Sequence, residues 1–595
     1  MSSPGSNPKG QGENGVVLFG TLEAVAPLFL LVLNLLIYWQ VTRHGFLNYL
    51  DDLILANNFH LRGGISSEGA AWCFRMVEGG GWRPLAWLSH MLDFNLYRLN
   101  PGSHHLTSLF FHTVNSMLLF LFLRRATGAR WLSVFIAALF AMHPLNVEPV
   151  AWVAERKTVL SAFFLLSSLW SYILYTEKPC PSRYVICLFL CALGLMAGPT
   201  AISLPLLLLI MDYWPLGRLR LKPKTGLPVQ REPTGVRHIF LEKIPFFALA
   251  LFSIAITLFL LPHREGPASE FSLAKIPFFY LFSLWKILLP HPLTVLYQPF
   301  GNISVWTAAG SLLLFVGISA LVVRLRRFPF LAAGWFWFLA TLTAAIAFNG
   351  VPDWPVMADR FAYVPLIGII IMVAWGCNRI VESAGRERIL LPLGGALLLS
   401  VMMVISGSQL RYWQNSVTLF SHAVTVSPKN AVVRNYLGFS LARERKYLEA
   451  TDQLTEALRL KSDDPEAHIN LGLVLDEQGR FQEAIAHFSE ALRIDPRCAK
   501  AHARWAMVLT RKGLFREAEK HYSEALKINP EDAEAHNNLG INLYTEGRFQ
   551  EAMRHYSEAL RIRPEYADAK RNLASLLHFM GRTPGEHNAG KIPSP

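Results

Sequence analysis

Long apolar runs, separated by short polar stretches, fill the first 410 residues of the chain. A helix needs about 20 apolar residues to cross a hydrocarbon core of about 30 Å. By this measure the sequence predicts eleven membrane spans, at about residues 22–42, 105–123, 131–147, 158–176, 184–197, 200–214, 244–262, 305–323, 330–348, 361–378 and 389–409. The fifth and sixth runs are short and meet at Gly198-Pro199, which favours one broken or re-entrant hairpin. The 12-residue run 278–289 is too short to span and is expected to lie at the membrane interface.

Residues 431–566 follow a different pattern, a repeat of 34 residues. Glycine near a turn, alanine where two helices cross closely and proline after the second helix are typical of tetratricopeptide repeats. The sequence therefore predicts four repeats and a closing helix near 567–580, stacked as a right-handed α-solenoid. The series that keep the period include Gly438, Gly472, Ala506, Gly540 and Ala574; Gly479, Gly513 and Gly547; Ala450, Ala484, Ala518 and Ala552; and Pro496, Pro530 and Pro564.

The two patterns give an all-α chain with a polytopic membrane domain followed by a solenoid. The run 24–39 has no basic stretch before it and no small-residue cleavage site after it, so we expect an anchor and not a cleaved signal peptide. The predicted organisation is a disordered N-terminus at 1–20, a transmembrane domain at 21–410 with a long outer loop at 43–104, a linker at 411–430, the solenoid at 431–582 and a disordered tail at 583–595.

Composition supports the membrane assignment and explains the charge. Hydrophobic residues make up 52% of the chain and charged residues 17%, and the net charge is +13. Residues 429–582 hold 24 basic and 23 acidic side chains, so the excess charge belongs to the apolar part. A nucleic-acid partner is therefore not expected.

The basic residues also predict an orientation. Five connections hold 18 basic and five acidic residues, whereas the loop 43–104 holds five of each. An excess of Lys and Arg marks the cytoplasmic side, which places the N-terminus inside and both the loop and the solenoid outside. The connection 215–243 also suits contact with anionic membrane lipid. The five basic connections are 124–130, 177–183, 215–243, 324–327 and 379–388.

The outer loop begins with the pair Asp51-Asp52, directly beyond the first span. Two adjacent carboxylates at a membrane surface are costly unless they are solvated, paired or bound to a metal. One could take a proton from an acceptor hydroxyl, and the other could hold a divalent ion such as Mg²⁺ or Mn²⁺. Taken alone, a solvated helix cap or turn is the simpler explanation of the pair.

Other polar clusters lie on the same predicted side. Ionisable groups at this depth usually line a cavity or contact a substrate, although snorkelling or a local ion pair is the simpler explanation of each one singly. Four cations could together hold a phosphate: Arg83, Arg156, Lys157 and Arg360. Five more residues are expected to line the site: His105, His143, Glu148, Glu155 and Asp359.

Several chemistries lack their sequence signatures. No Walker A loop and no G-x-G-x-x-G stretch is present, so no nucleotide cofactor is expected, nor is haem. The six cysteines are scattered without a C-x-x-C or Cys/His cluster, which indicates neither a structural zinc site nor a disulfide framework. His468, His502 and His536 recur at one repeat position, which is more typical of packing than of a metal site.

These motifs together resemble the transmembrane and tetratricopeptide-repeat O-mannosyltransferases, and most closely their bacterial relatives. The resemblance covers about residues 43–580 and rests on the aspartate pair, the stretch from Trp82 to Leu85, the loop from His143 to Lys157, the segment from Met357 to Pro365 and the repeats. It implies a GT-C glycosyltransferase fold, a polyprenyl-phosphate sugar as donor, and action on the outer face of the membrane.

The resemblance also implies roles for individual residues. One of Asp51 and Asp52 is expected to be the general base and the other an orienter or metal ligand, with a single displacement that inverts the anomeric carbon. Arg83, Arg156 and Arg360 match positions that stabilise the departing phosphate, and Lys157 matches mainly the bacterial form. The chain departs from the pattern at Gly198, where relatives carry Lys before Pro199.

The expected function is transfer of a sugar, mannose as the first choice, to Ser or Thr of exported proteins. The acceptor protein or peptide is expected on the concave face of the solenoid. The wording of the motifs favours a bacterial inner membrane with the solenoid in the periplasm. Two alternatives stay open: a non-enzymatic membrane-anchored scaffold, and a lipid-linked transferase or polymerase whose acceptor is a glycan.

Overall fold

The computed structural model describes residues 13–49, 51, 55, 58–78, 81–219, 235–260, 275–297, 303–349, 357–383 and 387–581. Asp52 and the predicted disordered segments 1–12 and 583–595 lie outside these residues. The chain divides into two units, Met1–Val426 and Ser427–Pro595. We call the first the membrane unit and the second the solenoid unit.

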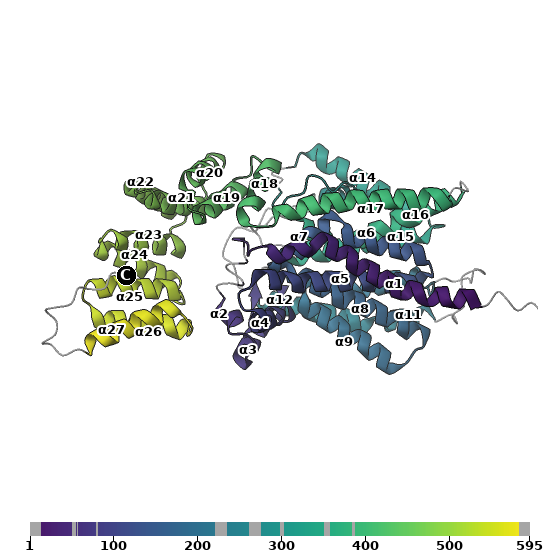
Figure 1. Ribbon diagram of the computed structural model, residues 1–595, viewed down its shortest axis with the longest axis horizontal. Coiled ribbons are helices and arrows are strands. Elements are labelled where there is room, and N and C mark those ends of the chain that lie inside the picture. Colours follow the sequence, from purple (N-terminus) through teal and green to yellow (C-terminus); the bar gives the residue numbers. More distant parts are fainter. Residues whose placement is uncertain are drawn as a thin grey trace, which may run out of the picture. The chain divides into compact units, whose positions relative to one another are not determined.

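The membrane unit is built from helices, and most of the long ones run side by side (Figure 1). Its first elements are α1 (Glu13–Tyr38), η1 (Trp39–Arg43), α2 (Phe59–Arg62), α3 (Ser67–Arg75), α4 (Pro84–Tyr97), α5 (Pro101–Thr127), α6 (Arg130–Met142), η3 (Pro144–Asn146), α7 (Val147–Ala151), η4 (Val153–Glu155), α8 (Arg156–Glu177), α9 (Pro181–Ala197), η5 (Pro199–Ser203) and α10 (Leu204–Tyr213). They are followed by α11 (Val236–Leu241), α12 (Ile244–Leu260), α13 (Ile276–Leu288), α14 (Val305–Arg324), α15 (Pro329–Asn349), η7 (Asp359–Ala362), α16 (Pro365–Ser383), α17 (Glu387–Tyr412) and α18 (Ser416–Val426). Two short antiparallel strands, β1 (Val77–Glu78) and β2 (Gly81–Trp82), pair Val77 with Trp82.

Local sequence signals fix the ends of these helices. At the start of α5 the Asn100 side chain accepts a hydrogen bond from the Ser103 amide, and Pro101 occupies the first turn. The helix ends at Gly128, whose φ of 72° lies in the left-handed region that glycine adopts without strain. The 27 residues between them are long enough to cross a membrane.

The all-α fold, with a polytopic membrane part followed by repeats, is confirmed, but fewer single helices span than the eleven predicted. Among the described residues, eight helices are long and apolar enough to cross a membrane. A ninth span results if α6 and the helical stretch after it, bent by 53°, count as one. All eleven predicted runs are helical, but a break at His143-Pro144 bends one run, and α9 and the η5–α10 stretch are short. The helix α13 is likewise a shorter apolar helix, as expected for residues 278–289.

Burial separates inner from outer helices in the membrane unit. The most apolar stretch of the span Val153–Glu177 is 67% buried within the protein, whereas that of α14 is 6% buried. Large apolar side chains such as Trp306 and Leu313 therefore stand exposed on α14. An exposed surface of this kind matches a hydrocarbon environment and not water.

Two predicted boundaries differ from the structure. The helix α1 begins at Glu13, so residues 13–20 are helical and not disordered. The stretch 1–20 is polar except for the apolar segment 16–19, which continues into the first span. The predicted linker 411–430 contains α18, and the Ser416 side chain there accepts a hydrogen bond from the Asn48 amide at 2.7 Å.

The solenoid unit consists of four helix pairs and a final helix, stacked in sequence order (Figure 1). A β-carbon placed on Gly472 would lie 2.9 Å from the Phe488 ring, which explains the glycine where the paired helices cross. Gly479 has a φ of 79° in the turn between them. The helices are α19 (Ala431–Arg443), α20 (Tyr447–Leu460), α21 (Pro465–Glu477), α22 (Phe481–Ile494), α23 (Ala499–Arg511), α24 (Phe515–Ile528), α25 (Ala533–Thr545), α26 (Phe549–Ile562) and α27 (Ala567–Met580).

Candidate functional site

Asp51 is fully buried and joins two parts of the membrane unit. Its Oδ2 accepts a hydrogen bond from the Leu47 amide, and its Oδ1 accepts one from the Ala154 amide, both at 3.0 Å. The carboxylate therefore ties the chain after η1 to η4. The two hydrogen bonds hold the carboxylate in one orientation.

A buried cluster of acids and bases begins beside η4. The Arg360 Nη1 lies 2.6 Å from Glu148 Oε1, and the Arg360 amide donates to Glu148 Oε2 at 3.1 Å. The Arg360 Nε lies 3.3 Å from Glu155 Oε1. On the other side of Glu155, the Lys157 ammonium lies 2.8 Å from the same Oε1. Residues from α7, η4, α8 and η7 thus meet, as the sequence suggested, and their predicted place on the outer side stays a prediction.

We call this group the acid–base cluster; it comprises Arg83, Glu148, Glu155, Lys157 and Arg360. Arg83 caps the start of α4, and its charge lies within electrostatic range of Lys157. The Arg360 guanidinium lies over the Trp152 ring, 5.3 Å from its centre, and the Tyr49 ring stacks on the same Trp152 ring with the ring centres 4.9 Å apart. Arg83, Glu155 and Arg360 are at most 6% exposed, but the Lys157 side chain is 17% exposed. Lys157 is thus the cation of this group that solvent reaches most easily.

Arg156 turns away from this cluster. Its guanidinium donates to Ser108 Oγ at 2.9 Å, to Ser89 Oγ at 3.2 Å and to the His104 carbonyl at 2.6 Å. It also lies 2.8 Å from Asp93 Oδ2, and it is fully buried. These contacts join α8 to α4 and α5, so in this structure Arg156 has internal partners where the sequence suggested a phosphate.

Asp359 is buried at the edge of the acid–base cluster. The Tyr297 hydroxyl donates to its Oδ1 at 2.5 Å. Burial, and then the neighbouring Glu148, raise the pKa of Asp359 to about 8. Burial beside Glu148 therefore favours the neutral form of the Asp359 carboxyl group.

His105 and His143 have backbone partners. The His105 Nε2 lies 3.4 Å from the Gly45 carbonyl oxygen. The His143 Nε2 lies 3.0 Å from the Ile287 carbonyl oxygen, and the Leu145 amide donates to its Nδ1 at 3.3 Å. Both rings connect backbone segments, and their predicted contact with a substrate stays a prediction.

The departure at Gly198 has a packing explanation. A β-carbon at this position would lie 3.0 Å from the Lys157 carbonyl oxygen and 3.2 Å from Ser161 Cβ. The Ser161 hydroxyl donates to the Gly198 carbonyl at 3.1 Å. The hairpin therefore packs closely on α8, and a side chain at position 198 would require its neighbours to shift by a few tenths of an ångström.

Sequence reasoning missed several residues around the site. Trp152, Tyr49 and Tyr297 were overlooked because aromatic residues beside apolar runs are common. Lys286 carried a usable signal, since it is a charge within the apolar helix α13 and ionisable groups in such segments are usually functional. Its ammonium donates to the Pro292 carbonyl at 2.5 Å and is close enough to Asp359 to affect that carboxyl group.

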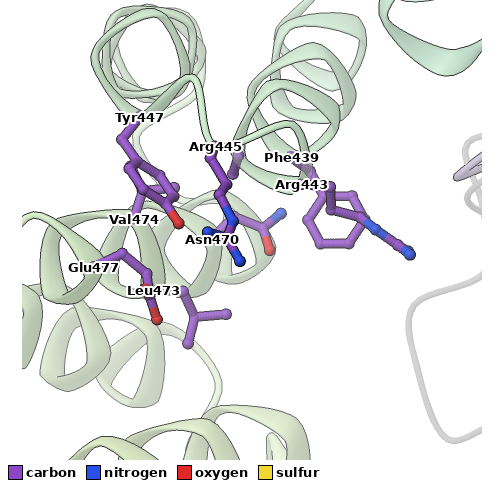
Figure 2. A pocket seen from close by; sticks show the side chains of 9 residues that line it. Phe439, Arg443, Arg445, Tyr447, Asn470, Leu473, Val474 and Glu477 are labelled. Carbon is purple, nitrogen blue, oxygen red and sulfur yellow. The ribbon is translucent and has the colours of Figure 1, made fainter.

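The solenoid unit contains a cavity of about 310 Å³ between its first two repeats (Figure 2). In Figure 2 the Arg445 side chain extends toward Asn470, whereas that of Arg443 points away from the other lining residues. Arg445 has a φ of 61°, and it occupies the turn position where the next three repeats have Gly479, Gly513 and Gly547. A non-glycine residue held there is strained by about 1–2 kcal/mol. The lining residues are Phe439, Ala442, Arg443, Arg445, Tyr447, Asn470, Leu473, Val474 and Glu477.

Three histidine pairs repeat along the solenoid unit. The Nδ1 atoms lie 2.9 Å apart in His468–His487 and 3.0 Å apart in His502–His521 and His536–His555. Burial, and then its partner His502, lower the pKa of His521 to about 4, and the pKa values of His487 and His555 are lowered for the same reasons. The histidines predicted as packing residues therefore do pack, but onto a second histidine series that sequence inspection missed.

The histidine pairs predict that acid lowers the stability of the solenoid unit. The unfolded chain takes up protons at the ordinary histidine pKa of 6.5, whereas folded His521 does so only near 4. The free energy of unfolding of the solenoid unit should therefore be unaffected above pH 6.5 and fall as the pH drops from 6.5 toward 4. Hydrogen exchange of α21–α26 against pH measures this. A variant with glutamine at 487, 521 and 555 should show a flatter profile, and an equal slope in both proteins would contradict the explanation.

Comparison with known proteins agrees with both units. Two family models described as tetratricopeptide repeat match residues 437–497 and 497–565. Protein O-mannosyl-transferase TMTC3 of Mus musculus is 25% identical over 444 residues, which cover 66% of this chain and 45% of the relative. Protein O-mannosyl-transferase Tmtc3 of Drosophila melanogaster is 25% identical over 470 residues, covering 66% and 49%.

The chain spans about half the length of these curated relatives. Among solved structures, YrrB, a tetratricopeptide-repeat protein with an unusual peptide-binding site, is 21% identical over 32% of this chain and 95% of its own, with a TM-score of 0.23. Long apolar helices and these relatives together make the protein an integral membrane protein. The chain is therefore a relative of the TMTC protein O-mannosyl-transferases, and it carries tetratricopeptide repeats over residues 437–565.

Proposed function

We propose that the protein transfers a sugar, mannose as the first choice, from a polyprenyl phosphate to serine or threonine of an exported protein. The observation that carries this proposal is the acid–base cluster, in which Arg83 and Arg360, from two other segments, lie near the partly exposed Lys157. Arg83, Lys157 and Arg360 would neutralise the departing lipid phosphate, while Arg156 would hold α8 in place.

The aspartate pair supplies the base in this proposal. Both oxygens of Asp51 already accept backbone hydrogen bonds, so Asp51 suits the orienting role and Asp52 the role of base. Asp52 takes the proton from the acceptor hydroxyl as that oxygen attacks the anomeric carbon. The bond from this carbon to the phosphate oxygen breaks, its electrons remain on the phosphate, and the configuration inverts. The Mg²⁺ or Mn²⁺ expected at the aspartate pair stays a prediction; both ions prefer oxygen ligands such as carboxylates.

The cavity of the solenoid unit is the proposed binding place for the acceptor. Strained backbone is often retained where a side chain has a function, and Arg445 combines strain with a place in the cavity wall. Asn470 adds an amide to the same cavity wall, so an extended peptide with acidic or carbonyl groups would fit.

Replacing Arg445 with glycine should separate stability from binding. The free energy of unfolding should rise by up to about 1 kcal/mol, because glycine adopts a φ of 61° without strain. Affinity for the acceptor should fall, because a cation leaves the cavity wall. Calorimetry and binding of an acceptor peptide measure the two effects. The Arg445→Gln variant keeps a long side chain at this strained position and removes its charge, so it should bind more weakly without a gain in stability. The Lys461→Ala variant outside the cavity should bind normally, and unchanged binding in both Arg445 variants would contradict the assignment.

The proposed location is a bacterial inner membrane, with the aspartate pair and the solenoid unit on the periplasmic side. The test of the whole proposal uses membranes enriched in the protein and a radiolabelled polyprenyl-phosphate mannose. Label in serine- or threonine-linked hexose on an exported protein supports it. Label in a polysaccharide would instead favour a glycan acceptor, and the absence of transfer together with stable co-purified partners would favour a scaffold.

A further inference from the structure

Three buried side chains that the proposed mechanism does not use converge at the base of the outer loop. His90 and Asp93 are one turn apart on α4, and His104 lies in the first turn of α5. One ligand atom from each lies within 4.8 Å of the other two. All three residues are at most 3% exposed.

Two of the atoms that face one another in this group are acceptors, and the third is a ring nitrogen of His90. The His104 Nε2 lies 2.8 Å from the Arg98 carbonyl oxygen, so this nitrogen carries the ring proton. The neutral ring then directs the Nδ1 lone pair toward Asp93 Oδ2, 3.5 Å away. His90 Nδ1, Asp93 Oδ2 and His104 Nδ1 are all buried without a hydrogen-bond donor among the described residues. Facing acceptors of this kind repel one another unless a cation lies between them.

Arg156 offsets only part of this charge. Its Nη2 lies 2.8 Å from Asp93 Oδ2 but directs its hydrogen bond to the His104 carbonyl, at 2.6 Å. Within the described part of the chain, His90 Nδ1 and His104 Nδ1 have no hydrogen-bond partner. A guanidinium beside the site lowers the affinity for a cation but leaves these ligand atoms available.

The surroundings resemble those of a metal site. Metal-binding histidines usually donate their other ring N–H to a carbonyl or carboxylate, and metal-binding carboxylates are themselves hydrogen-bonded. His104 donates to the Arg98 carbonyl, and the Thr107 hydroxyl donates to Asp93 Oδ1 at 2.9 Å. Both contacts fix the ligands in the orientation that points them toward the shared centre.

We propose that His90, Asp93 and His104 bind one divalent transition-metal ion, of which Zn²⁺ is the preferred member. Two imidazole nitrogens and one carboxylate oxygen suit zinc, whereas Mg²⁺ prefers oxygen ligands only. The ion would fasten the outer loop to α5. Through Arg156 it would also fix the start of α8, next to Lys157. This centre is separate from the Mg²⁺ or Mn²⁺ expected at the aspartate pair.

The test measures metal on the full-length protein in detergent micelles. The protein is stripped with a chelator, loaded with Zn²⁺ or Co²⁺ and dialysed. Zinc is then measured by elemental analysis and cobalt by its visible absorption bands. We expect one ion per chain in the natural protein and at least a tenfold lower affinity in His90→Gln and His104→Gln. The control variant carries glutamine at His487, His521 and His555, because the solenoid pairs are the rival source of imidazole ligands, and it should keep the ion.

Three results would overturn the proposal. The first is no bound zinc or cobalt in the natural protein, which would leave buried water as the partner of these side chains. The second is unchanged binding in both His90→Gln and His104→Gln, and the third is loss of the ion in the solenoid control alone. If the glutamine variants fail to fold, Asp93→Asn decides. It keeps the size of the side chain and removes its charge, so it should weaken cobalt binding at least tenfold and alter the cobalt spectrum. An unaltered spectrum and affinity would refute the site.

Discussion

Asp52→Asn should lower sugar transfer by about 100-fold or more, the usual contribution of a general base. Asparagine has nearly the same size but cannot accept the proton of the acceptor hydroxyl. The thermal unfolding midpoint of the purified protein should stay unchanged. The measurement is initial-rate transfer from a labelled polyprenyl-phosphate sugar, with the unfolding midpoint recorded on the same preparation.

Asp51→Asn is the matched comparison and should behave differently. An asparagine side chain offers one acceptor oxygen where the carboxylate offers two, so the Leu47 or the Ala154 amide loses its partner. Burying an unsatisfied donor costs about 1–3 kcal/mol. Both transfer and stability should therefore fall together. Full activity of Asp52→Asn, or a large loss in Asp51→Asn without loss of stability, would reverse the proposed roles.

Arg360→Gln should be among the most destabilising single changes in the membrane unit. The guanidinium contacts Glu148 at 2.6 Å and Glu155 at 3.3 Å, and all three residues are buried. Removing one member of a buried ion pair leaves an uncompensated charge, at a cost of about 3–5 kcal/mol. Denaturant unfolding in detergent micelles and the yield of folded protein should both report this loss.

Two controls give this prediction its meaning. Arg125 forms a comparable contact with Glu177, at 2.7 Å, but the Arg125 side chain is 45% exposed. Arg125→Gln should therefore cost less than about 1 kcal/mol. The Glu148→Gln/Arg360→Gln double variant should recover part of the lost stability, because it removes the unpaired carboxylate as well. Equal losses in Arg360→Gln and Arg125→Gln would show that burial is not the cause.

The fold followed from the sequence wherever the signal was periodic. The 34-residue series placed the turn at Gly479, the crossing at Gly472 and a closing helix that the structure has as α27. The apolar runs identified helices, but length alone did not distinguish a span from a bent or short helix. The break at Gly198-Pro199 was predicted from the glycine and proline themselves, whereas the bend at His143-Pro144 falls inside a run that was predicted as one span.

Only part of the candidate site could be predicted from the sequence. The sequence suggested that Glu148, Glu155, Lys157 and Arg360 share one face, and the structure brings them together. The sequence analysis gave Arg156 and Lys157 the same role. In the structure they point in different directions from the start of α8, Arg156 toward Asp93 and Lys157 toward Glu155. His90 and Asp93 were missed because a single histidine and a single aspartate on a short helix carry no pattern until α5 brings His104 beside them.

The histidine pairs also determine which repeats of the solenoid unit acid should unfold first. In the first repeat the equivalent contact joins Arg434 Nη1 to Gln453 Oε1 at 2.9 Å, a pair that does not titrate in mild acid. Stability in such arrays is a sum of repeat and neighbour energies. Acid should therefore loosen the later repeats first and fray the array from its C-terminal end. About half of the cavity wall is formed by α19 and Arg445, which belong to the first repeat. This repeat should be the last to unfold in acid.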